Sequence, residues 1–298
     1  MKKFYFLPAL LVIISVTLVL QSCKDEDEGP QVPRTELYVI DIGNFDKGPW
    51  KIIRYNEEGG DPKTVIGAGL SWPQDIIFLE DRGEMLVSNF ITGLIQRYDI
   101  ETFEQKANFA TGIGSPTRMK IRDGLLYVVL WQGNGKVRRY QLDGTFVDEF
   151  TSIGVNNSIG LDWDADGNLY VSSYNNGADG FVRKFDPDGK DLGNFIDSNL
   201  NGPTNIWFNA SGHLLVNDFV GGAIREFDAD GNFVRNAVNG LSQVEGVDFM
   251  ENGNVLIGNG GTGTIKMYTP DLTFIKDVVP SKSGGLVRPN GVIVRNVK

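Results

Sequence analysis

The sequence has few residues that support thiol, imidazole or nucleic-acid chemistry. Its 298 residues include one cysteine, Cys23, and one histidine, His213. A single cysteine can form neither a disulfide within the chain nor a zinc site built from cysteines. Asp and Glu number 38 against 28 Lys and Arg, for a net charge of -10. Nucleic acid is therefore not expected as a partner, because its binding needs a basic face that releases counterions.

One long uncharged run occurs, at the start of the chain. Residues 4–20 follow Lys2 and Lys3 and lead into Leu-Gln-Ser and then Cys23. This arrangement resembles the lipobox of bacterial lipoproteins, which implies a signal peptide over residues 1–22 and a lipid on Cys23. An uncleaved membrane anchor is the alternative, although the run is short for a span and Pro8 interrupts it.

The residues after Cys23 predict a tether. Residues 24–28 read Lys-Asp-Glu-Asp-Glu, and a glycine and two prolines follow. We therefore expect residues 23–35 to be the lipidated cysteine and an acidic, flexible tether. The Cys-Lys-Asp-Glu start also resembles the export signal of surface lipoproteins in Bacteroidota, which implies an outer-membrane lipoprotein facing the cell exterior. A solvated tether that carries no such signal is the alternative.

Short apolar runs recur after residue 35, and no useful helical periodicity accompanies them. An aromatic residue ends a strand-like run six times, at intervals of 41 to 45 residues: Tyr55, Tyr98, Tyr140, Phe185, Phe227 and Tyr268. Each full unit holds four strand candidates, joined by Asp- and Gly-containing sequences that suit hairpin turns better than calcium loops. A four-stranded unit at this interval is the signature of a propeller blade.

The ends of the repeat region predict how the ring closes. Residues 289–294 match only the first strand of a unit, whereas residues 36–67 begin at the second strand. Residues 36–298 are therefore predicted to form an all-β, six-bladed β-propeller whose C-terminal strand pairs with the N-terminal three strands. Such closure removes exposed sheet edges.

One unit carries a family resemblance. Residues 159–172 contain a glycine, alternating apolar residues, then Asp-Gly-Asn and Tyr-Val. This order resembles the NHL repeat and, more distantly, the senescence marker protein and gluconolactonase group of six-bladed propellers. The resemblance covers residues 36–298 and implies the fold, on which both binding proteins and enzymes occur.

Aromatic residues are expected around one end of the central channel. Phe90, Trp131, Tyr174 and Phe219 follow four successive second strands at the same position, and Trp72 lies on an adjoining loop. Such rings suit a glycan or a protein ligand, and packing between loops as a structural lid is the alternative. Arg118 is expected on this face, where it would meet an acidic ligand or pair with a neighbouring carboxylate.

A second hypothesis rests on four oxygen-bearing residues. Glu245, Asn290, Asp75 and Asn205 occupy corresponding positions near the first strands, and Ca²⁺ accepts such oxygen ligands. In the gluconolactonase group a Glu, an Asn and an Asp from different blades hold a divalent cation, so the resemblance implies a calcium-dependent lactonase or ester hydrolase. Here the Glu lies in the fifth whole unit rather than near the start. Satisfying loop backbone groups is the alternative role.

Histidine chemistry is not expected at the same face. His213 follows Ser-Gly at the start of a second strand, on the opposite side from the aromatic loops, and is interpreted as a turn residue. This placement disfavours a Ser-His-Asp triad and a histidine-ligated zinc. The favoured hypothesis is a non-catalytic, surface-anchored propeller that binds a glycan or a protein ligand, and a scaffold that contacts partners through its outer rim is a third.

Overall fold

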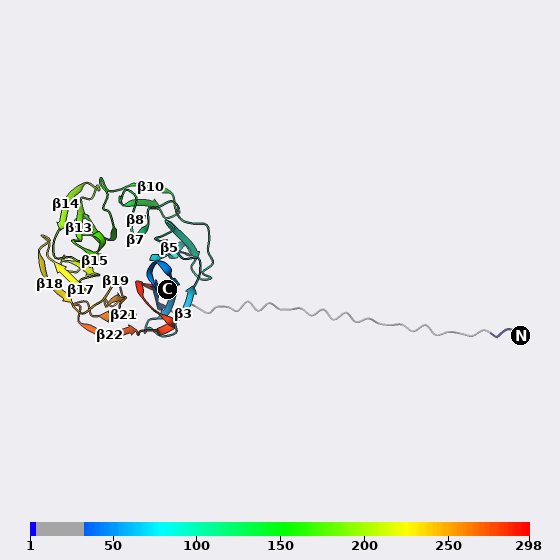
Figure 1. The fold of residues 1–298 in the computed structure, drawn as a ribbon. Coiled ribbons are helices and arrows are strands. Elements are labelled where there is room, and N and C mark those ends of the chain that lie inside the picture. The colour runs from blue at the N-terminus through cyan, green and yellow to red at the C-terminus, as the bar shows by residue number, and fades with distance from the viewer. Residues whose placement is uncertain (4–32) are drawn as a thin grey trace. The chain divides into compact units, whose positions relative to one another are not determined.

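The computed structural model describes residues 1–3 and 33–298, and Figure 1 shows strands arranged in a ring. The predicted signal peptide, most of the tether and Cys23 lie outside the described residues. Five sheets have four strands each, one has three, and each makes one blade. Within the part of the chain that is described, no helix has the length and apolar character needed to cross a membrane.

The blades are numbered from the one that holds both ends of the ring. Blade 1 consists of β23 (Pro289–Val297), β1 (Arg34–Asp41), β2 (Lys51–Asn56) and β3 (Lys63–Ile66). Blade 2 consists of β4 (Pro73–Leu79), β5 (Glu84–Asn89) and β6 (Leu94–Asp99). Blade 3 consists of β7 (Pro116–Arg122), β8 (Leu125–Leu130), β9 (Arg138–Gln141) and β10 (Phe146–Glu149). Blade 4 consists of β11 (Ser158–Trp163), β12 (Leu169–Ser173), β13 (Phe181–Phe185) and β14 (Asp191–Ile196). Blade 5 consists of β15 (Pro203–Phe208), β16 (Leu214–Asp218), β17 (Ala223–Phe227) and β18 (Phe233–Val238). Blade 6 consists of β19 (Val244–Phe249), β20 (Val255–Asn259), β21 (Thr264–Tyr268) and β22 (Phe274–Val279).

The ring closes as predicted. Strand β23 pairs antiparallel with β1, from Arg34 opposite Val297 to Asp41 opposite Pro289. Arg295 of β23 then reaches blade 2, where its Nε lies 2.9 Å from Glu80 Oε1. The two ends of the chain thus complete blade 1 together, and this pairing stabilises the whole ring.

The core lies between the blades. Second strands such as β8 are almost wholly buried, since each blade packs its two faces against its neighbours. The recurring aromatic residues of the third strands, represented by Tyr55 and Phe185, are at most 4% exposed. One apolar cluster, for example, joins Leu37 of blade 1 to Leu256 of blade 6. The repeat read from the sequence is therefore the packing unit of the core.

Blade 2 departs from the predicted four-stranded unit. After β6 only two isolated bridges continue the sheet, Ile95 with Ala110 and Tyr98 with Gln105. Phe103 has a φ of 58°, and its ring lies 6.3 Å from that of Tyr38 in blade 1. Residues 105–110 still lie beside β6, since Lys106 N donates to Arg97 O at 2.8 Å and Phe109 N donates to Ile95 O at 2.9 Å. The fourth strand of this blade is therefore an irregular segment rather than a regular ladder.

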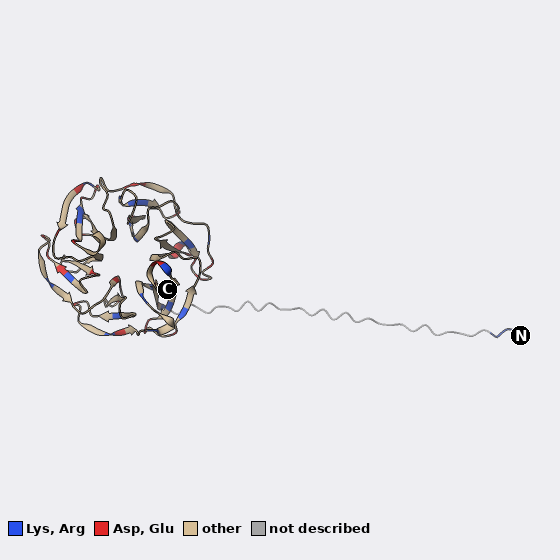
Figure 2. Ribbon diagram, viewed as in Figure 1, with Lys and Arg blue, Asp and Glu red and all other residues tan. Residues whose placement is uncertain are grey.

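Charged residues of both signs are spread around the ring, as Figure 2 shows. Many form pairs between adjacent strands of one blade, such as Arg183 with Asp191 and Lys266 with Asp277 at 2.8 Å. Partly exposed pairs of this kind contribute little to stability individually. The interaction that matters for the channel is a buried pair, described below.

Candidate functional site

One hydrogen bond recurs in all six blades and fixes the loops at one end of the channel, which we call the mouth. The residue directly after each second strand donates its backbone N–H to the residue directly before a first strand. Examples are Phe90 to Trp72 at 3.1 Å and Trp131 to Ser115 at 3.0 Å. The acceptor residue has a positive φ in most blades, 51° at Trp72. A bulky residue in this conformation is strained, which is typical of functional positions.

These loops place six aromatic rings in a continuous arc at the mouth. Ring centroids of sequential neighbours lie 4.9 to 6.2 Å apart, in the order Phe45, Trp72, Phe90, Trp131, Tyr174 and Phe219. All six are half-buried, so each ring packs on its neighbours and still has a free surface. The arc has a gap at blade 6, where Gly260 takes the corresponding position.

The arc surrounds a cavity of about 300 Å³. Its aromatic walls are the six rings, and its other lining residues are Ile42, Gln74, Ile159, Thr204, Glu245 and Asn290. The cavity therefore combines apolar walls with a small number of polar groups, as small-molecule sites commonly do. The structure brings the five predicted aromatic residues together here, and Arg118 lies below them.

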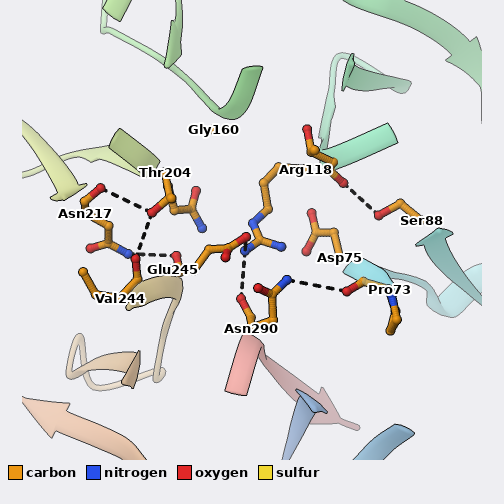
Figure 3. A network of polar contacts seen from close by, with 12 residues as sticks. Pro73, Asp75, Ser88, Arg118, Gly160, Thr204, Asn217, Val244, Glu245 and Asn290 are labelled. Atoms are coloured by element: carbon orange, nitrogen blue, oxygen red, sulfur yellow. Dashed lines mark hydrogen bonds and ion pairs between the residues drawn. The ribbon is translucent and has the colours of Figure 1, made fainter. Parts of the chain in front are cut away.

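A buried ion pair crosses the channel beneath the cavity (Figure 3). Arg118 Nη2 donates to Glu245 Oε1 at 3.0 Å and to the backbone carbonyl of Asn290 at 2.8 Å. Arg118 is 3% exposed and Glu245 is 7% exposed. The Nε and Nη1 atoms of Arg118 have no hydrogen-bond partner among the described residues. Of the two roles predicted for Arg118, the structure shows the pairing with a carboxylate.

Burial raises the pKa of Glu245 to about 7, against the opposing effects of Arg118 and Asn290. The charge of Asp75 raises it further. The Asn290 amide lies 2.6 Å from Glu245 Oε2, and its nitrogen donates there when turned toward the ionised carboxylate. A protonated Glu245 can instead donate to the amide oxygen, so the orientation of Asn290 follows the protonation of Glu245.

A second cavity, of about 340 Å³, lies on the other side of the ion pair. Arg118, Asp75 and Asn205 line it, together with Asp248. Asp75 Oδ2 accepts a hydrogen bond from Met119 N at 2.8 Å and thereby joins blade 2 to blade 3. Burial raises the pKa of Asp75, and it raises that of Asp248 to about 6. Apolar residues form most of the lining of this cavity, and its polar groups serve in part to connect blades.

The four predicted metal ligands do not fit a calcium ion in this arrangement. The Arg118 guanidinium lies between Glu245 and Asp75 (Figure 3), so it supplies the positive charge that a cation would bring. Asn205 lines the far cavity and accepts a hydrogen bond from Ile206 N at 3.2 Å. Across residues 1–3 and 33–298 no group of three or more His, Cys, Asp or Glu side chains could hold a metal ion.

The structure also places His213, which the sequence predicts as a turn residue, and Phe45, which the sequence did not indicate. His213 Nδ1 lies 2.8 Å from Glu226 Oε1, and His213 N donates to Asn209 Oδ1 within the turn. The sequence did not indicate Phe45 as a residue of the mouth cavity. Phe45 lies in the 3-10 turn η1 (Phe45–Lys47), three residues beyond the shared aromatic position, so no register could have indicated it.

Comparisons with known proteins agree on the fold. No family model matches the chain, and no curated protein matches it. A structure described as a nidogen/laminin complex aligns with a TM-score of 0.69 and 18% identity, over 87% of this chain and 98% of that chain. A protein of unknown function from Bacteroides caccae aligns with a TM-score of 0.68 and 16% identity, over 88% of this chain and 98% of that chain.

A third solved structure, described as a candidate gluconolactonase, aligns with a TM-score of 0.59 and 18% identity, over 70% of this chain and 78% of that chain. At identities this low a likeness carries the fold and not the activity. The chain is thus similar in fold to proteins that differ in their described functions.

Proposed function

We propose that this protein is a non-catalytic binding protein that takes a glycan into the aromatic mouth of its propeller. The continuous arc of six half-buried rings around one cavity carries this proposal. Aromatic faces stack on the apolar faces of sugar rings and give a large contact area at a small cost in side-chain entropy. Gln74 and Asn290 line the same cavity and suit hydroxyl groups as hydrogen-bond partners.

The size of the cavity favours a sugar over a protein surface. Its volume of about 300 Å³ is at the small end of the range for ligand pockets. A stable protein partner would instead bury about 800 Å² on each side, far more than the mouth cavity alone provides. We infer that one sugar unit at the end or in a branch of a glycan enters the mouth.

The lactonase alternative has less support. Its calcium site would need Glu245 and Asp75 as free ligands, whereas Arg118 pairs with Glu245 at 3.0 Å and Asp75 accepts a hydrogen bond from blade 3. No second acid lines the mouth cavity beside Glu245. A binding function requires none of these groups to be free.

We further propose that the protein is anchored by a lipid on Cys23, at the outer membrane and facing the cell exterior. The proposal is supported by the apolar run, the cysteine and the acidic residues that follow it. Mass spectrometry of the mature N-terminus and protease accessibility in whole cells test it. An unmodified Cys23, or a protein protected from external protease in intact cells, would contradict it.

Trp131→Ala tests the binding proposal on a glycan array. We expect the ligand found with the natural protein to bind at least tenfold more weakly, because the change opens the centre of the arc. Phe146→Ala is the matched control, since Phe146 is an aromatic residue that is 51% exposed on the outer strand β10. Equal binding by both variants, or an array without any bound glycan, would overturn the proposal in favour of a protein ligand.

A further inference from the structure

The mouth cavity has an uneven charge. Glu245 is its one acidic lining residue, and no Lys, Arg or His lines it. Arg118, which pairs with Glu245, contributes instead to the cavity on the other side of the channel. A ligand in the mouth therefore meets a carboxyl group and aromatic faces, while the compensating guanidinium lies beyond them.

We propose that the sugar which enters the mouth carries a positively charged ammonium group, as an amino sugar with a free amine does. This inference rests on the glycan-binding function proposed above and names its ligand class. The ammonium group would lie over the aromatic faces and point toward the Glu245 carboxylate. Cations are attracted by the negative face of an aromatic ring, and Trp is the strongest ring for this interaction.

One ring of the arc already contacts a cation in the structure. The Arg288 guanidinium carbon lies 3.8 Å from the centroid of the Phe45 ring. The remaining rings include Trp72 and Trp131, which line the cavity, and no cation of the described residues is recorded over either ring. A ligand cation would make at these two rings the contact that Arg288 makes at Phe45.

The state of Glu245 is consistent with a site for a cation. Its ion pair with Arg118 leaves the carboxyl incompletely stabilised, since burial still outweighs the attraction. Asp75, the other nearby acid, adds repulsion. A second positive charge above Glu245 would therefore be favourable, whereas an anionic ligand would meet a carboxyl group and the negative faces of the rings.

The test compares two ligands that differ at one position in each sugar unit. A glucosamine tetramer carries ammonium groups where cellotetraose carries hydroxyl groups, so the two are close in shape. Both are titrated into the natural protein at pH 7.0 and low salt, where about half of Glu245 is ionised, and the fluorescence of Trp72 and Trp131 reports binding. We expect the Kd of the glucosamine tetramer to be at least tenfold lower, equivalent to about 1.4 kcal/mol.

Glu245→Gln should remove most of this preference and retain binding of cellotetraose. Circular dichroism checks that the variant is folded, and the comparison of ligands on the natural protein does not depend on it. Equal or weaker binding of the glucosamine tetramer overturns the ammonium inference and leaves glycan binding intact. Absence of binding by both sugars, together with an empty glycan array, overturns the proposed function and the inference with it.

Discussion

Removing either member of the buried Arg118–Glu245 pair should have unequal consequences. Arg118 is 3% exposed, its guanidinium keeps its charge at any accessible pH, and Glu245 is the one carboxylate recorded within ion-pair distance of it. At pH 8.5, where Glu245 is ionised, Glu245→Gln therefore removes the carboxylate paired with Arg118 and leaves Asp75 as the remaining nearby acid. Losing one partner of a buried pair costs about 3 to 5 kcal/mol, and we expect about 3 kcal/mol at pH 8.5 because the Gln oxygen still accepts a hydrogen bond. At pH 6, where Glu245 is mostly protonated, we expect a much smaller effect.

Arg118→Met should be milder at low pH. Glu245 already has a pKa of about 7 in the folded protein, so it is mostly protonated at pH 6 and loses little when Arg118 is removed. At pH 8.5 the variant must fold with Glu245 protonated, about 1.5 pH units above that pKa. At about 1.4 kcal/mol per unit this adds roughly 2 kcal/mol of destabilisation.

The sign for the natural protein follows from the same pKa. The folded value of Glu245 lies above its model value of 4.5, so the folded state binds more protons between these two values. The stability contribution of Glu245 is thus lost as pH rises from about 4.5 to about 7. The difference in unfolding free energy between Arg118→Met and the natural protein isolates the contribution of Glu245, because the other buried acids titrate in both proteins.

Urea unfolding at pH 6 and pH 8.5 measures these effects. Lys266→Met is the matched control, because Lys266 pairs with Asp277 at 2.8 Å on the outside of blade 6 and should change stability by less than about 1 kcal/mol. The reasoning is refuted if the effect of Arg118→Met is the same at both pH values. It is also refuted if, at pH 8.5, Glu245→Gln destabilises no more than Lys266→Met.

Three further outcomes are expected. Gly246→Ala should destabilise the protein by about 1 to 3 kcal/mol, because the added Cβ would lie 2.8 Å from Gly291 Cα on the neighbouring inner strand. Gly67→Ala is the control, since a Cβ there meets only Thr64 Cγ2, at 3.4 Å. Equal urea midpoints for the two Ala variants would contradict this prediction. Arg295→Met should lower the melting temperature, since it removes the 2.9 Å contact that ties β23 to blade 2, and an unchanged value would show that strand pairing alone closes the ring. Millimolar calcium added after chelator treatment should leave the melting temperature unchanged, and a rise that Glu245→Gln abolishes would establish the metal site.

The ring could be predicted from the sequence because each blade repeats the same local pattern. Regularly spaced aromatic residues such as Tyr55 and Phe185 indicated the third strands, and the incomplete units at both ends indicated how β23 meets β1. The missing outer strand of blade 2 could not be predicted. Residues 105–110 lie beside β6 through hydrogen bonds such as Phe109 N to Ile95 O at 2.9 Å, but their pairing is too irregular to form a ladder, and no residue in this segment signals that irregularity.

The sequence could predict which residues lie at equivalent positions in the blades, but not which of them contact one another. A common register grouped Phe90 with Trp131 because both follow second strands, and the structure places them in one wall. The same register treated Arg118 and Glu245 as separate candidates, for an acidic ligand and for a metal. Their 3.0 Å contact joins blades 3 and 6 across the channel, and residues 127 positions apart give no sequence sign that they meet.

The direction of β1 has a consequence for access to the mouth of the channel. This strand begins at Arg34 and ends at Asp41, next to Ile42 of the mouth. Its eight residues extend the chain by roughly 26 Å, so the chain enters the ring on the face remote from the mouth. Arg34 and the mouth therefore lie at opposite ends of β1, and a ligand can reach the aromatic arc without passing the residues at which the ring begins.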